Sequence, residues 1–183
     1  GRRRQMCIRD RAPVGATVAI MGAGGIGFDV AEYLTQAGPS TSLDPQAWAA
    51  EWGVDTAYRQ AGGLTEPQEE PSARKVFLLQ RKDSKVGAGL GRTTGWIHRT
   101  VLKNRGVVFI AGAVYERIDD AGLHVRVGER STVLPADTVV LAPGPEPIPH
   151  LYAVLAAPGA DARLIGRSTP PAPPAPTTPI KTA

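Results

Sequence analysis

Three glycines near the start of the chain, Gly22, Gly24 and Gly27, have the spacing G-x-G-x-x-G. An apolar run at residues 17–21 precedes them and predicts a buried strand, and residues 26–37 follow with a helical pattern. In such a unit the first glycine permits a tight turn and the second lets the backbone approach a diphosphate. The third lets helix and strand pack closely. The spacing therefore predicts a dinucleotide site, with the amides at the start of the helix facing the phosphates.

The predicted helix carries Ile26, Val30 and Leu34 along one side and ends before Gly38 and Pro39. The neighbouring Gly25 is expected to contribute backbone to the same site. Glycine-rich turns are common, so an ordinary strand-to-helix turn with nothing bound remains the alternative.

A second apolar run, residues 75–80, predicts the next strand and ends in Gln80, Arg81 and Lys82. In NAD-binding units an acidic residue at this place binds the ribose 2′-OH. This chain has no carboxylate there, and Arg81 could instead bind a 2′-phosphate with a forked hydrogen bond while Lys82 adds a point charge. We therefore predict NADP(H) rather than NAD(H). The alternative is a basic loop that is simply solvated.

Further candidates follow this strand. Gly87, Gly89 and Gly91 form a loop that could either approach a ligand closely or lie free on the surface. Lys85 adds a cation beside that loop. Trp96, at the start of the next predicted helix, is expected to pack in the core, with ligand contact as the alternative.

We predict no catalytic acid, base or nucleophile and no metal site. His98 is expected to be a surface or hydrogen-bonded histidine, and His124 alternates with apolar residues in a strand and is expected to face solvent. Cys7 is the single cysteine, which excludes an intramolecular disulfide framework and a multi-cysteine metal site. Such a residue set fits hydride chemistry, in which the cofactors react and the protein orients them.

An insert at residues 39–73 separates the first helix from the second strand. Asp44 and Pro45 predict the start of a short helix that carries Trp48 and Trp52 four residues apart on one face. We expect this tryptophan pair to pack on the domain rather than to clamp a cofactor. The insert is long for a strand–helix connection, and such loops are often lids or contact surfaces.

In the second half of the chain the spacing of the apolar residues changes. A helix is predicted within residues 92–105 and a strand at 107–110, after which residues 114–134 alternate with period 2 and predict three antiparallel strands. Residues 138–142 predict a buried closing strand. The sum is an α/β fold, a Rossmann-like doubly wound parallel sheet with an antiparallel β-meander covering one side.

Composition narrows the functional classes. The 183 residues are 42% hydrophobic with a net charge of +4, so the chain can bury a core. Its cations scatter rather than form a stripe with aromatics, which argues against nucleic acid. No apolar run approaches the roughly 18 residues of a membrane span, and the N-terminus lacks the apolar region of a secretory signal, so we expect a cytoplasmic protein.

The expected divisions of the chain are 1–12 as a disordered or non-native extension, 13–147 as the nucleotide-binding domain, 148–167 as a segment that could include a strand at 164–166, and 168–183 as a disordered Pro/Thr-rich tail.

Four stretches resemble one family. They are residues 12–29 around the glycine turn, 51–64 with Glu-Trp-Gly-Val-Asp and Gln-Ala-Gly-Gly-Leu, 79–99 from Leu-Gln-Arg-Lys to Trp-Ile-His-Arg, and 115–125. From residue 12 to about residue 166 the chain closely resembles the C-terminal region of bacterial NADPH-dependent 2,4-dienoyl-CoA reductases, flavoproteins related to old yellow enzyme. This resemblance implies the NAD(P)-binding domain of the kind found in FAD/NAD(P)-linked disulfide reductases.

The resemblance also implies a reaction. Those enzymes pass electrons from NADPH to FAD, through a 4Fe–4S cluster to FMN, and then to a dienoyl-CoA. The chain matches the NADPH-binding part, which is inserted in a split FAD domain, and residues 148–167 would begin the return to that domain. We expect the FMN barrel, its substrate site and the cluster to lie in other sequence, because one cysteine cannot hold a cluster. We also expect the isolated chain to bind NADPH without turnover.

The family pattern assigns roles residue by residue. Gly22, Gly24 and Gly27 match the diphosphate turn, Arg81 and Lys82 match the NADP-binding pair, Lys85 and Trp96 lie near bound ligand, and Ala142 to Pro147, with Gly144, match the segment that returns to the FAD domain. Pro143 and Pro145 depart from the family pattern there, and so does the sequence after Gly166, so we expect no FAD binding by this chain alone. The alternative function is a non-catalytic nucleotide-sensing or interaction module of Rossmann type.

Overall fold

The computed structural model describes residues 13–68 and 71–144. The predictions for residues 1–12 and for residues 145–183, including the strand expected at 164–166, lie outside the described residues. Within the described part, strands and helices alternate as the sequence predicts, and the chain then enters the period-2 region.

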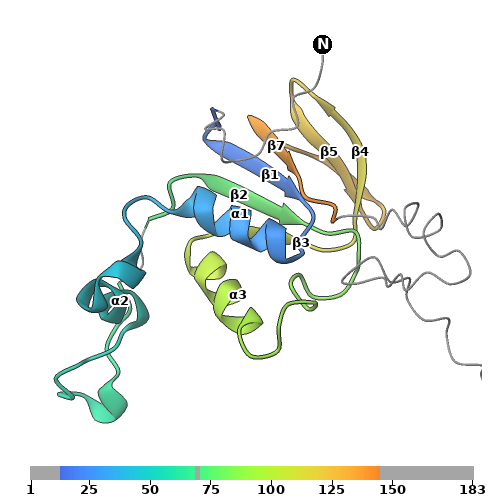
Figure 1. The fold of residues 1–183 in the computed structure, drawn as a ribbon. Helices are drawn as coiled ribbons and strands as arrows, with labels where there is room; N and C mark the ends of the chain where they lie inside the picture. Colours follow the sequence, from blue (N-terminus) through green and yellow to red (C-terminus); the bar gives the residue numbers. More distant parts are fainter. Residues whose placement is uncertain (1–12, 69–70, 145–183) are drawn as a thin grey trace, which may run out of the picture. The chain divides into compact units, whose positions relative to one another are not determined.

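The centre of the fold is a parallel sheet of four strands (Figure 1). Its strands are β1 (Thr17–Met21), β2 (Lys75–Leu79), β3 (Val108–Ile110) and β7 (Thr138–Leu141), in the order β3-β2-β1-β7. The register pairs Met21 with Leu79 on one side and with Leu141 on the other. All pairs are parallel. The predicted sheet is therefore confirmed.

The sheet has different partners on its two faces because successive side chains of a strand point to opposite sides. Val18 and Ile20 of β1 are fully buried in a core shared with the helices α1 (Gly25–Thr35) and α3 (Gly95–Asn104). Ala19, between them, belongs to a second core on the other face. Strand β2 divides its side chains between the two cores in the same way. Both helices lie on one side of the sheet (Figure 1).

The second face is covered by the meander, whose strands are β4 (Ala113–Asp119), β5 (Gly122–Val127) and β6 (Arg130–Leu134). They form an antiparallel sheet in chain order. Leu123 and Val125 are fully buried and belong to the same core as Phe77 and Leu79 of β2. The predicted antiparallel meander, covering one side of the parallel sheet, is confirmed.

Two side chains differ from expectation. Ile26, in the first turn of α1, is 61% exposed, whereas Val30 and Leu34, which share its side of the helix, are buried as predicted. Trp96, in the first turn of α3, is 59% exposed, and Leu102 is the fully buried side chain of that helix. Periodicity alone predicted each helix correctly but not the exposure of the apolar side chain in its first turn.

Strand β7 is not the buried strand that its sequence predicts. Its first three residues are half-buried and Leu141 is 62% exposed. The reason is its position, since β7 is at the edge of the sheet and pairs with β1 alone among the strands of the described residues.

The insert carries its own short helix, α2 (Pro45–Trp52). Asp44 caps it by accepting hydrogen bonds from the amides of Gln46 at 2.9 Å and Ala47 at 3.3 Å, which satisfies donors that a helix start leaves open. The rings of Trp48 and Trp52 lie side by side, with centroids 6.4 Å apart. The predicted cap, helix and tryptophan pair are confirmed, although Trp48 remains 45% exposed.

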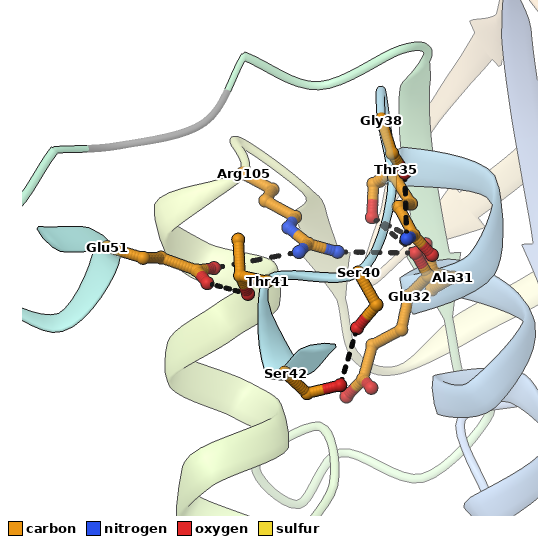
Figure 2. A network of polar contacts seen from close by, with 10 residues as sticks. Ala31, Glu32, Thr35, Gly38, Ser40, Thr41, Ser42, Glu51 and Arg105 are labelled. Carbon is orange, nitrogen blue, oxygen red and sulfur yellow. Dashed lines mark hydrogen bonds and ion pairs between the residues drawn. The ribbon is translucent and has the colours of Figure 1, made fainter. Parts of the chain in front are cut away.

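A polar network fastens the insert to the helices (Figure 2). Arg105, just after α3, reaches the Glu51 carboxylate of α2 at 3.6 Å and donates to the backbone oxygen of Glu32 in α1 at 3.3 Å. Thr41 donates to the other oxygen of Glu51 at 2.5 Å. The insert thus follows the C-terminal end of α1, whereas the glycine turn precedes the N-terminal end of that helix (Figure 1). It is not a lid over the glycine turn.

Candidate functional site

The carboxyl ends of three parallel strands meet at one edge of the sheet. Because Met21 pairs with both Leu79 and Leu141, the segments that follow β1, β2 and β7 all start at this edge. The Gly22 amide donates to the Leu79 oxygen at 2.9 Å, and the Ala142 amide donates to the Met21 oxygen at 2.9 Å. Strand order reverses at β1, and ligands of open α/β sheets bind at such a switch point.

The four glycines of the turn have two different surroundings. Gly22 has φ +121°, and a Cβ there would collide with the carbonyl group of Ala142. A Cβ on Gly27 would collide with the backbone oxygen of Gly22. A Cβ on Gly24 or Gly25 would meet no atom within 4 Å. Gly22 and Gly27 are therefore required by the fold, whereas the absence of side chains at Gly24 and Gly25 leaves open space, which fits a diphosphate.

The start of α1 is electrostatically suited to an anion. Gly24 is the N-cap and offers no side chain to the helix, and the first turn contains no acidic residue. The first helical hydrogen bond runs from the Phe28 amide to the Gly24 oxygen at 3.1 Å. The positive end of the helix dipole thus has no carboxylate of its own, which favours a negatively charged group at the turn.

Arg81 and Lys82 lie in the loop directly after β2, with both side chains exposed. The register places this loop beside the glycine turn, because β1 and β2 are neighbours that end together. Burial raises the pKa of the Tyr115 phenol, and the charge of Arg81 opposes this rise. The structure therefore brings two predicted cations to the edge that carries the turn.

The roles of two residues near this loop were not predicted from the sequence. Gln80 stabilises the loop through its side-chain amide, which donates hydrogen bonds to the Lys82 oxygen at 2.9 Å and to the Ser84 oxygen. The charge of Arg81 acts on the pKa of the Tyr115 phenol in β4. The sequence placed Gln80 at the end of the predicted strand, directly after the residues of β2, but no pattern predicted its hydrogen bonds or linked Tyr115 to this loop.

Lys85 and Trp96 are both exposed, and the Trp96 indole donates to the Thr93 oxygen at 3.0 Å. Of the nearby glycines, Gly87 has φ +79° and packs so closely on the Phe28 ring that a Cβ would be 2.6 Å from it. Gly87 is therefore structural, while Gly89 is open. Contact of Lys85 or Trp96 with a cofactor stays a prediction.

The segment after β7 closes one side of the turn. The carbonyl of Ala142 lies against Gly22, and Gly144 is exposed with φ +85°. Ala142 is thus in contact with the glycine turn through its backbone, and contact of Ala142 or Gly144 with a cofactor stays a prediction.

The histidines are engaged in the fold. Nδ1 of His98 is 2.6 Å from a carboxylate oxygen of Glu32, which joins α3 to α1. The side chain of His124 is only 15% exposed and lies 2.9 Å from the Asp119 carboxylate, so the expectation that it faces solvent is wrong. The hydrogen bond from His124 lowers the pKa of Asp119, together with the charges of His124 and Arg117. Neither histidine is positioned at the glycine turn.

A polar cavity of about 490 Å³ lies within the insert, lined by residues that include Gln46, Arg59 and Thr65. Asp55 lines it as well. Burial raises the pKa of this carboxyl group, but the hydrogen bonds from the Arg59 and Ala57 amides and from the Arg59 guanidinium outweigh burial and leave that pKa lowered. Asp55 thus acts as an ionised anchor of its own loop.

Residues 13–68 and 71–144 contain no cluster of three or more His, Cys, Asp or Glu side chains that could hold a metal ion. In the same part of the chain, every helix is too short or too polar to cross a bilayer.

The fold and this edge define a nucleotide-binding domain with a meander, the class in which a parallel sheet presents a glycine turn to a dinucleotide. The family model for pyridine nucleotide-disulphide oxidoreductases matches residues 4–161. The chain therefore belongs to that family of FAD- and NAD(P)-dependent oxidoreductases.

Solved structures with the same fold include a 2-naphthoyl-CoA reductase, at a TM-score of 0.50 and 17% identity, which aligns with 75% of this chain and 16% of its own. The bacillithiol disulfide reductase of Bacillus cereus aligns at a TM-score of 0.47 and 14% identity, with 78% of this chain and 32% of its own aligned. The chain thus spans less than a third of each of these proteins. At 17% identity the likeness to the 2-naphthoyl-CoA reductase concerns the fold alone.

Proposed function

We propose that this chain is the NADPH-binding module of a flavin-dependent oxidoreductase resembling 2,4-dienoyl-CoA reductase. The observation that carries the proposal is the shared edge. The open glycine turn at Gly24 and Gly25 and the exposed cations Arg81 and Lys82 follow two neighbouring strands that end in register. One dinucleotide with a phosphorylated ribose needs both features at once.

The described residues supply binding and orientation. The amides at the start of α1 and the bare backbone of Gly24 would hold the diphosphate, and Arg81 and Lys82 would hold the 2′-phosphate. Nothing at this position would repel that phosphate, because β2 ends without a carboxylate. When bound, NADPH supplies the hydride, and the protein's part is to keep the dinucleotide in place for transfer to FAD.

The finer part of the proposal rests on sequence. The stretches at residues 51–64 and 79–99 carry the resemblance to the dienoyl-CoA reductases, since generic Rossmann domains lack them, and the first of the two lies in the insert at residues 39–73. On this basis the partners are an FAD domain, an FMN barrel with a 4Fe–4S cluster, and a dienoyl-CoA substrate, all held by other sequence of a cytoplasmic enzyme. Fatty acid metabolism is the proposed setting.

The proposal predicts a preference that a titration can measure. Charge-assisted hydrogen bonds contribute about 1.5–3 kcal/mol each, so the 183-residue chain should bind NADPH at least about tenfold more tightly than NADH. Isothermal titration with each nucleotide at one salt concentration provides both dissociation constants. Equal affinities would contradict the assignment of the 2′-phosphate to Arg81 and Lys82, and absence of binding to either would contradict the proposed function itself.

A further inference from the structure

The side-chain amide of Gln80 spans the loop that carries the two cations. Its Nε2 donates to the Lys82 oxygen at 2.9 Å and to the Ser84 oxygen, and Ser84 Oγ is 3.4 Å away. The backbone of Gln80 is held as well, because its amide donates to Ile110 and its oxygen accepts from Ala113, each at 2.9 Å. One residue therefore joins the end of β2 to the neighbouring chain and to its own loop.

The oxygen of Lys82 receives a second hydrogen bond, from the Gly112 amide at 3.0 Å. Two donors on different segments thus fix this carbonyl group, while the Lys82 side chain and the neighbouring Arg81 stay exposed. Held in this way, the loop keeps one backbone conformation before any ligand arrives, and a preformed site loses less conformational entropy on binding.

We propose that Gln80 is a positioning residue that sets the preference for a 2′-phosphate by holding the loop that presents Arg81 and Lys82. This inference rests on the proposed function and deepens it, since Gln80 itself need not touch the cofactor. It acts through the backbone of the residues that do.

The chemistry of the amide explains why glutamine suits this place. Its nitrogen carries two N–H donors without a charge, and the loop presents two backbone oxygens, those of Lys82 and Ser84. A glutamate of the same shape could only accept hydrogen bonds, so it would lose both contacts. It would also place a carboxylate where NAD-binding units carry one for the ribose 2′-OH. Loop conformation and cofactor choice thus depend on the same side chain.

The test compares Gln80→Ala and Gln80→Glu with the wild-type chain by titration with NADPH and NADH. Loss of the loop contacts in Gln80→Ala should lower the NADPH-to-NADH affinity ratio about fivefold to tenfold, with NADH affinity unchanged. Gln80→Glu should lower the ratio further. The matched control is Gln36→Ala, which removes a glutamine-to-carbonyl hydrogen bond, 2.9 Å to Gly38, at the far end of α1 and should leave the ratio unchanged.

A second readout does not depend on the cofactor. Amide hydrogen exchange at Gly112, which donates to the same Lys82 oxygen, should accelerate in Gln80→Ala and not in Gln36→Ala. A wild-type preference for NADPH that survives in Gln80→Ala, or equal losses for both nucleotides, would overturn the positioning role while the proposed function stands. Unchanged exchange at Gly112 would overturn it too. A wild-type chain without any preference would refute the assignment of the 2′-phosphate to Arg81 and Lys82, and the positioning role with it, whereas a chain that binds neither nucleotide would refute the proposed function.

Discussion

Replacing Arg81 with glutamate should weaken NADPH binding about 100-fold and change NADH binding only a few-fold. The variant removes the forked donor for the 2′-phosphate and puts a negative charge in its place, so lost attraction and new repulsion add. NADH lacks that phosphate and loses neither interaction. Titration of both nucleotides measures the two effects, with thermal unfolding to show that the exposed substitution leaves the fold intact.

The matched control is Lys103→Glu, which makes the same change in net charge. Lys103 is in the last turn of α3, which leads into the start of β3 and so lies at the opposite edge of the sheet. It should leave the NADPH-to-NADH ratio within about twofold, because the Debye length at physiological salt is only about 8 Å. An equal effect of the two reversals would show that overall charge, rather than the loop after β2, governs binding.

Replacing Gly27 with valine should lower the free energy of unfolding by on the order of 3 kcal/mol. The new Cβ would run into the backbone oxygen of Gly22, and Gly22 cannot retreat because its own backbone lies against Ala142. Two backbone segments would have to move apart where helix and strand meet. Urea unfolding of wild type and variant, followed by tryptophan fluorescence, measures the difference.

Gly25→Val provides the comparison at an adjacent position. No atom lies within 4 Å of a Cβ at Gly25, so its unfolding free energy should stay within about 0.5 kcal/mol of wild type. The valine would nevertheless fill the space proposed for the diphosphate, so NADPH and NADH should both bind at least about tenfold less tightly. A stable Gly27→Val chain, or a Gly25→Val chain that binds both nucleotides normally, would contradict the roles given to these glycines.

Much of the fold could be predicted because the buried strands are short, continuous apolar runs in the sequence. The apolar runs that contain Ile20 and Leu78 are buried on both faces, so sequence and structure agree on where β1 and β2 begin. The meander was equally clear, since Leu123 and Val125 alternate with polar neighbours along one buried face. Asp44 and Pro45 marked the start of α2 through local hydrogen bonding and backbone geometry, which need no tertiary information.

The errors arise where tertiary contacts decide. Trp96 was expected inside, but it lies in the first turn of α3 and is exposed, while Leu102 further along the same helix is fully buried. Leu141 reads as core, yet an edge strand has a neighbour on one side only. His124 reads as solvent-facing, but its side chain contacts the Asp119 carboxylate at 2.9 Å and is only 15% exposed. The exposure of Trp96 and Leu141 thus depends on segments distant in sequence, whereas the partner of His124 is five residues away in the same hairpin.

The candidate site likewise contains parts that the sequence predicts and parts that it does not. The glycine spacing and the cations after β2 could be predicted because both follow directly after strands, which the sequence locates. The contact of Gly22 with Ala142 and the loop held by Gln80 were not, because they depend on segments brought together by the register of the sheet. Sequence patterns thus identify the groups that would meet the cofactor, and the structure adds the groups that hold them.

The central claim is that one NADPH molecule spans the glycine turn and the loop after β2. Amide NMR spectra of the isotope-labelled chain, titrated in parallel with NADPH and NADH, test this directly. Both nucleotides should shift the signals of Gly24, Gly25 and Gly27, and NADPH alone should further shift those of Arg81 and Lys82. NADPH-specific shifts that fall elsewhere, or glycine signals that neither nucleotide moves, would contradict the account.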